Sequence, residues 1–286
     1  MTLIVGHAPG GRRGGVTRLE SVSVLDLDAY LNRIGCRRPA IADVHRAQLV
    51  AIPFENLDPQ RGVPVSLAPA DLERKLVSER RGGYCFELNL LLRAALEALG
   101  ADVELMLARV RAGAPAGAVR PRSHLVLRVR GEGATRLADV GFGRGGLMEP
   151  VPFGAGGPYE QSGWGYRVVE DGPELVLQAR DGNEWADMYG FEPEPVPFVD
   201  LETSNWYTST HPRSPFVTGL IVCAHRPDGR RLFLRGFEEP ALTEESPAGQ
   251  KVTSVALDAI PHVLASEFGL GGFALDAGRG RLVPVA

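Results

Sequence analysis

Apolar residues follow a helical spacing through the first third of the chain. Between Leu25 and Gly100 they recur every three to four residues, the period of a helix with one buried face. Gly35 and Gly100 are typical of helix ends, while Asp43 and Pro69 are typical of helix starts. The pattern predicts helices over residues 25–35, 43–49, 69–77 and 85–99. The last is apolar on nearly every face, so we expect it at the centre of a helical layer.

After Gly100 the apolar residues alternate with polar ones. Alternation with a period of two, interrupted by glycine-rich turns, is typical of antiparallel strands. From about Phe198 the pattern becomes mixed, and it predicts further strands together with a helix near 260–268. The predicted strands span residues 103–107, 124–129, 136–140, 166–169, 174–179, 218–224 and 231–234.

These elements predict an α+β fold with three parts that share a centre. An N-terminal helical bundle is followed by a central antiparallel sheet or β-barrel, and a C-terminal α/β lid completes the fold. We assign 1–22 to a flexible leader, 23–100 to the helical bundle, 101–200 to the β-barrel and 201–286 to the lid.

Composition excludes several classes of protein. The chain has 286 residues, of which 44% are apolar and 23% charged, so it is too apolar to be disordered. A formal charge of −4 argues against a basic surface that grips nucleic acid. Glycine and proline are frequent but follow no repeat, which excludes collagen-like and solenoid folds.

The sequence also carries no membrane or secretion signal. Its longest apolar runs, such as 88–92, are far shorter than the ~18 residues of a membrane span. The N-terminus lacks the basic segment and apolar core of a signal peptide. We therefore predict a cytoplasmic protein with no membrane or nucleic-acid partner.

Three cysteines are present, and their odd number and spacing predict neither a disulfide framework nor a metal site. Cys85 follows a Gly-Gly turn at the start of the helix 85–99. Free N–H groups and the helix dipole stabilise a thiolate at such a position, where a cysteine pKa of ~8.5 can fall to roughly 3.5–7.5. On position alone, a buried structural cysteine is an equal alternative. Cys36 and Cys223 lack a base at matched spacing and are interpreted as structural.

A candidate base for Cys85 is His124, at the start of the strand 124–129. If residues 131–132 form a two-residue turn, residue 124 lies directly opposite Asp139 on the next strand. A four-residue loop would place the two on a diagonal of the same face. Cysteine, histidine and aspartate then supply the nucleophile, base and orienting group of covalent acyl transfer.

Several motifs resemble the arylamine N-acetyltransferase family. They are the segments 52–57 (IPFENL), 81–89 (RGGYCFELN), 139–143 (DVGFG) and 205–216, in the family's order, and the resemblance spans about residues 25–270. It implies a Cys-His-Asp triad at Cys85, His124 and Asp139, within a cysteine-protease-like core. It also implies a ping-pong reaction with acetyl-CoA as co-substrate, no permanently bound cofactor, and an arylamine, arylhydroxylamine or hydrazine as acceptor.

The resemblance extends to residues around the triad. Four apolar residues match positions that line the family's acceptor pocket, although ordinary core packing is an alternative for each. Glu55 is expected to pair with Arg81 and brace the turn that carries Cys85. The pocket residues are Phe54, Val110, Phe142 and Phe216.

Arginines at two places in the chain are expected to affect substrate binding. The loop 109–122 holds four arginines, and we expect Arg120 and Arg122 to bind the phosphates of CoA. A solvated loop is an equal alternative. Arg144 follows the Gly-Phe-Gly turn, where the family has a small or polar residue, and we expect it to narrow or charge the acceptor pocket.

The triad leaves other functions open. An amide synthase of the same fold, which closes a carrier-bound polyketide chain into a macrolactam, would use the same three residues. Hydrolysis is a second alternative, and a non-catalytic binding module is a third. The motifs do not specify the physiological amine, the length of the acyl chain or the oligomeric state.

Overall fold

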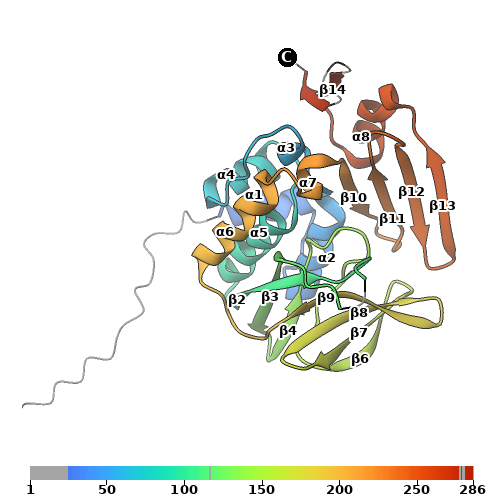
Figure 1. The fold of residues 1–286 in the computed structure, drawn as a ribbon. Coiled ribbons are helices and arrows are strands. Elements are labelled where there is room, and N and C mark those ends of the chain that lie inside the picture. Colours follow the sequence, from blue (N-terminus) through green and yellow to red (C-terminus); the bar gives the residue numbers. More distant parts are fainter. Residues whose placement is uncertain (1–24, 116, 277, 279–280, 286) are drawn as a thin grey trace, which may run out of the picture.

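The structure is a computed structural model that describes residues 25–115, 117–276, 278 and 281–285. The predicted leader, 1–22, lies outside the described residues. A helical layer, a large antiparallel sheet and a smaller C-terminal sheet pack around one another (Figure 1). This arrangement confirms the predicted α+β fold.

The helical layer forms from the predicted N-terminal segments. Asp26 caps the first helix by accepting the N–H of Ala29, and Gly35 ends it with a left-handed φ of 67°. The second helix begins at Ile41, so the predicted start at Asp43 is wrong: Ala40 is the N-cap and Asp43 lies in the first turn. There its charge still favours the positive end of the helix dipole. The helices are α1 (Leu27–Ile34), α2 (Ile41–Ala51), α3 (Leu57–Gln60), α4 (Pro69–Glu73), η1 (Arg74–Ser78) and α5 (Cys85–Ala98).

Helix α5 lies at the centre of this layer, as its apolar faces predicted. Phe86 and Leu92 are fully buried, and α5 contacts α1, α2 and α4 on one side and strands β2 and β3 on the other. This contact brings the start of α5 to the sheet that carries the predicted base.

An eight-stranded antiparallel sheet, ordered β5-β4-β3-β2-β9-β8-β7-β6, forms the nearly closed barrel. Its interior is filled by alternating side chains such as Met106, Val126 and Leu177. Five of the predicted strands match β2, β3, β4, β7 and β8, although β4 ends at Ala138, two residues before its predicted end, whereas β5, β6 and β9 were not predicted. The strands are β2 (Asp102–Val110), β3 (Arg122–Gly131), β4 (Ala134–Ala138), β5 (Val151–Pro152), β6 (Gly156–Gln161), β7 (Trp164–Asp171), β8 (Glu174–Asp181) and β9 (Glu184–Phe191).

The turn between β3 and β4 differs from its prediction. Gly131 pairs with Ala134, so the two-residue turn is Glu132-Gly133, and both residues have positive φ, as a type I′ turn requires. The register therefore moves by two residues, and Asp139 follows the last paired residue, Ala138. Because the shift is even, Asp139 stays on the face of His124, on the diagonal.

The C-terminal part contains a five-stranded sheet, ordered β1-β10-β11-β12-β13. Its first strand, β1 (Phe54–Glu55), comes from the helical region and pairs with β10, so the N-terminal layer is joined to the lid. A helix was not predicted over 198–210. The elements are α6 (Phe198–Thr210), α7 (Pro215–Thr218), β10 (Ile221–His225), β11 (Arg231–Arg235), β12 (Ala241–Ser246), β13 (Gly249–Ser254), η2 (Leu257–Ala259), α8 (Ile260–Phe268), β14 (Phe273–Asp276) and β15 (Arg281–Pro284).

Candidate active site

Cys85 is the first residue of α5 and is buried, with 3% of its surface exposed. The Glu87 carboxylate accepts the backbone N–H of Tyr84 at 3.0 Å, which anchors the turn before the helix. Close backbone packing requires glycine at position 141, since a Cβ there would lie 2.7 Å from the Cα of Cys85. The start of α5 and the segment 139–143 are therefore held in direct contact.

His124 and Asp139 form a buried pair beside Cys85. The Nε2 atom of His124 lies 2.7 Å from Oδ2 of Asp139. Burial alone would lower the pKa of His124, but the charge and hydrogen bond of Asp139, together with those of Cys85, raise this pKa to about 10. The structure thus brings the three residues together, with the imidazole between the carboxylate and the thiol.

Asp139 is held by further donors. Asn89, one turn after Cys85 on α5, donates from Nδ2 to Oδ1 of Asp139 at 2.9 Å, and the N–H of Gly141 donates to the same oxygen at 2.8 Å. Burial opposes ionisation of Asp139, but the charge of His124 and these hydrogen bonds lower its pKa. Sequence reasoning missed Asn89, although its position four residues after Cys85 places both on one face of a helix.

Aromatic rings surround the pair. The ring of Phe142 lies 5.3 Å from that of His124, and the ring of Tyr189 lies 5.0 Å from it. The ring of Tyr189 also lies 5.2 Å from that of Phe142. Burial raises the pKa of Tyr189, and the nearby carboxylate of Asp139 raises this pKa further. Tyr189 was not predicted as a site residue.

The other three predicted pocket residues lie in two places. The rings of Phe54 and Phe216 are 6.0 Å apart, and Phe216 also contacts Tyr84 at 5.6 Å, so both flank the residue before Cys85. Val110, at the end of β2, pairs with Tyr189 of β9. Of the four predicted residues, Phe142 contacts His124 directly, whereas Phe216 reaches the Cys85-His124-Asp139 group through Tyr84, Phe54 through Phe216, and Val110 through Tyr189.

A buried ionic cluster supports the turn that carries Cys85. Arg81 binds Glu55 through Nη2 at 2.6 Å and Nε at 3.0 Å, as predicted, and also reaches Asp58 at 3.2 Å. Lys75 extends the cluster by binding Asp58 at 2.6 Å and Glu87 at 2.7 Å. We call Glu55, Asp58, Lys75, Arg81 and Glu87 the ionic brace.

The arginines of the loop 109–122 are mostly paired within the protein. Arg111 binds three carboxylates, those of Asp171, Glu174 and Asp187, at 2.6–3.1 Å, and Arg122 forms an ion pair with Glu192. For Arg120, the described residues provide no carboxylate at ion-pair distance, and its Nη2 donates to the Gly113 carbonyl at 3.3 Å. Arg109, Arg111 and Arg120 line a hollow of about 540 Å³.

Arg144 extends toward the C-terminal sheet. It binds Glu245 of β12 and Gln250 of β13, each at 3.1 Å, and its guanidinium lies over the ring of Phe233. The positive charge of Arg144 is therefore balanced by Glu245 of the C-terminal sheet.

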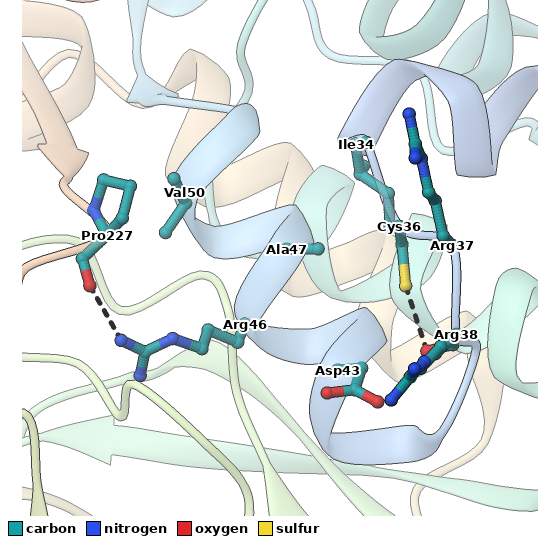
Figure 2. Close-up of a pocket in the computed structure, with 10 residues that line it drawn as sticks. Ile34, Cys36, Arg37, Arg38, Asp43, Arg46, Ala47, Val50 and Pro227 are labelled. Carbon is teal, nitrogen blue, oxygen red and sulfur yellow. Dashed lines mark hydrogen bonds between the residues drawn. The ribbon is translucent and has the colours of Figure 1, made fainter.

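A second hollow, of about 470 Å³, lies between α1, α2 and the loop after β10 (Figure 2). Arg46 crosses it and donates to the Pro227 carbonyl at 2.8 Å, while the Cys36 thiol donates to the Arg38 carbonyl at 3.3 Å. The residues that line this hollow do not include Cys85, His124 or Asp139.

Clusters of metal ligands and membrane-spanning helices are both absent from the part of the chain that the structure describes. No group of three or more His, Cys, Asp or Glu side chains there could hold a metal ion. No described helix is long and apolar enough to cross a membrane.

Comparison with known proteins connects this geometry with a family. Residues 39–272 match the model of the N-acetyltransferase family. The chain is 43% identical over 216 residues to an arylamine N-acetyltransferase of Mycolicibacterium smegmatis, covering 72% of this chain and 78% of that protein. It is 35% identical over 254 residues to an arylamine N-acetyltransferase / N-hydroxyarylamine O-acetyltransferase of Salmonella typhimurium, covering 86% and 89%.

A solved structure is similar over almost its whole length. The arylamine N-acetyltransferase of Mycobacterium marinum, in complex with CoA, matches with a TM-score of 0.80 and 36% identity, over 86% of this chain and 93% of that one.

Proposed function

The chain belongs to the arylamine N-acetyltransferase family, and on that premise we propose that it carries an acetyl group from acetyl-CoA to an amine through a thioester on Cys85. The acceptor is an arylamine, arylhydroxylamine or hydrazine. The observation that carries the proposal is the buried contact of Cys85, His124 and Asp139, in which the pKa of His124 is raised to about 10. Such an imidazole stays protonated at neutral pH and favours a thiolate beside it.

In the first half-reaction the Cys85 thiolate attacks the carbonyl carbon of acetyl-CoA. The C–S bond to CoA breaks, and the departing sulfur takes the proton held by His124, so that CoA leaves as a thiol. Backbone N–H groups at the start of α5 are the candidate donors to the oxyanion that forms in between. His124 is then neutral, and Cys85 carries the acetyl group.

In the second half-reaction the amine nitrogen attacks the thioester carbon. His124 takes a proton from the nitrogen, the bond to Cys85 breaks, and the thiolate and imidazolium are restored. Phe54, Val110, Phe142 and Phe216 are proposed to contact the acceptor. Exchange between two thioesters is nearly isoenergetic, so the protein mainly has to supply the thiolate, the oxyanion donors and the apolar pocket.

The donor distinguishes this proposal from the amide synthase. The M. marinum relative is described in complex with CoA, which favours a CoA donor here. Among the arginines of the loop 109–122, Arg120 is proposed to contact CoA, because it has no carboxylate partner among the described residues; Arg122 would have to leave Glu192 to do so.

Intact-protein mass spectrometry after mixing with acetyl-CoA, without an amine, tests the proposal. We expect the wild type to gain one acetyl group, Cys85→Ala to gain none, and the matched variant Cys36→Ala to behave as the wild type. An arylamine or a hydrazine should then discharge the adduct. Absence of the adduct in folded wild type would overturn the proposal and favour the carrier-fed amide synthase, while rapid loss to water would favour a hydrolase.

A further inference from the structure

A second buried histidine, His45 of α2, contacts the turn that carries Asp139. Its side chain is fully buried, and its Nε2 accepts the backbone N–H of Asp139 at 3.2 Å. Strand pairing between β3 and β4 ends at Ala138, so this N–H lies beyond the last pair of the ladder. His45 therefore takes the place that a neighbouring strand would occupy, and it comes from a different layer of the fold.

The bond at Nε2 determines the tautomer of His45. A neutral imidazole can accept at Nε2 only if its proton is on Nδ1. Burial lowers the pKa of His45 to about 4, against the opposing effects of Asp139 and of the Met148 backbone, so the ring is neutral at neutral pH. The Met148 backbone lies near the ring, but no hydrogen bond of ordinary geometry reaches Nδ1 from the described residues.

Packing alone does not explain a histidine at this position. A buried donor without a good partner destabilises a fold, and a leucine would fill a similar volume without that cost. The hydrogen bond to Asp139 is what a leucine could not supply. Its partner is the backbone of the residue whose carboxylate orients His124.

We propose that His45 is a positioning residue for acetyl transfer, an inference that rests on the proposed function. Asn89 and Gly141 fix the Asp139 carboxylate, while His45 fixes the peptide from which that side chain projects. Without His45 the peptide can rotate, and the carboxylate then no longer holds the imidazole in line with the Cys85 sulfur. A displacement of about 1 Å in an active site is enough to lower a rate by about a hundredfold.

Three substitutions separate this role from a general contribution to packing. His45→Leu keeps the volume and removes the acceptor. The amide oxygen of His45→Gln reaches about as far as Nε2 and can accept the Asp139 N–H, whereas the shorter side chain of His45→Asn reaches only as far as Nδ1. The measurement is the single-turnover rate of Cys85 acetylation, followed by CoA release as a function of acetyl-CoA concentration, with thermal unfolding of each variant.

We expect His45→Leu and His45→Asn to lower the maximal rate about tenfold to hundredfold, with little change in the acetyl-CoA concentration that gives half of it. His45→Gln should stay within about threefold of the wild type. If His45→Leu does not fold, the difference between the Gln and Asn variants decides. His225→Gln is the matched control, because His225 is also buried near Asp139 but no hydrogen bond joins the two. The acetylation rate of this variant should equal that of the wild type.

Equal rates for the Gln and Asn variants, or a wild-type rate in His45→Leu, would overturn the role of His45. A loss of rate in His225→Gln as large as that in His45→Leu would do so too, since it would reflect packing. Failure of the proposed function gives a different result, because the wild type itself would then not be acetylated.

Discussion

The two sides of the candidate active site are held in place by different forces. The turn before Cys85 rests on the ionic brace, in which the carboxylates of Glu55, Asp58 and Glu87 share the cations of Lys75 and Arg81. The segment that carries Asp139 rests on neutral groups, namely the amide of Asn89, the N–H of Gly141 and the ring of His45. Among the described residues, Asp139 has an ion pair only with His124.

Carboxylates therefore have different roles on the two sides of the candidate active site. In the ionic brace three carboxylates share two cations, so no single pair dominates. The charge of Asp139 is left to act on one imidazole, which is why the pKa of His124 is raised despite complete burial.

Asp139→Asn should have the largest effect. The amide keeps the shape of the carboxylate but removes its charge, so the pKa of the buried His124 should fall and the proton needed by the leaving sulfur should be lost. We expect the rate of Cys85 acetylation to decrease by about 10³- to 10⁴-fold. Asp187→Asn, which alters a carboxylate of the ion pair with Arg111, is the control and should stay within about twofold. A rate within about tenfold of the wild type in Asp139→Asn would contradict the assigned role.

Arg81→Ala tests the turn before Cys85, where the main expected effect is on stability. Removing this guanidinium leaves Glu55 buried without its main partner, so the free energy of unfolding should fall by about 3–5 kcal/mol, and the yield of folded protein and the rate should fall with it. Denaturant titration measures the change. Arg93→Ala, which breaks a more exposed pair with Glu97 on α5, should cost only about 0.5 kcal/mol. A stable and fully active Arg81→Ala protein would show that the brace is unnecessary.

Acid should weaken the side that carries Asp139 through two buried histidines. Burial lowers the pKa of His45 to about 4 and that of His225 to about 3, from the usual 6.5. Between these values and 6.5 the unfolded chain binds protons that the folded protein excludes, so the contribution of the two histidines to stability is complete above about pH 6.5 and decreases as the pH falls. In the brace, Lys75 and Arg81 overcome burial and lower the pKa of Asp58, whereas burial raises the pKa of Glu87 to about 6. Glu87 is therefore protonated first in the brace, and its proton uptake partly offsets the decrease.

The contribution of a single histidine can be measured by the slope of this decrease. His225→Gln removes one of the two groups, so the free energy of unfolding should change with pH less steeply by about 1 kcal/mol per pH unit below about pH 6. Denaturant titrations at three pH values give the slope. An unchanged slope would show that His225 is not a neutral buried group.

Local sequence rules were sufficient to place the three proposed catalytic residues and insufficient to find the residues that support them. The start of α5 placed Cys85, and strand alternation placed His124 and Asp139 on one face even though the turn lies at Glu132-Gly133. The prediction of a shared face was correct because an error of two residues in the strand register leaves each side chain on the same face of the sheet. His45 and Tyr189 act on Asp139 from elements distant in sequence, so no local pattern indicates them.

The missed helix α6 has a similar physical explanation. Its sequence, FVDLETSNWYTST, is rich in serine and threonine and has no clear apolar face, and only Leu201 among its aliphatic side chains is fully buried. Polar contacts to distant segments hold it instead. Ser204 donates to the Arg122 carbonyl, and Asn205 donates to the Val65 carbonyl at 3.0 Å.

The smallest predicted effect concerns the half-buried arginines of the loop 109–122, which contrast with the buried brace. Charge reversal of Arg120 should raise the KM for acetyl-CoA about fivefold with kcat unchanged, since one solvent-exposed contact to a phosphate is worth about 1 kcal/mol. Arg122→Glu should have a smaller effect, because the guanidinium of Arg122 is already bound to Glu192 in the wild type, and Arg180→Glu, on β8, is a surface control. Added salt should reduce the difference between Arg120→Glu and the wild type, because screening weakens an exposed contact. An unchanged KM in Arg120→Glu and in the double variant with Arg122→Glu would mean that this loop does not bind the donor, and the positive charge for CoA would then have to come from another part of the chain.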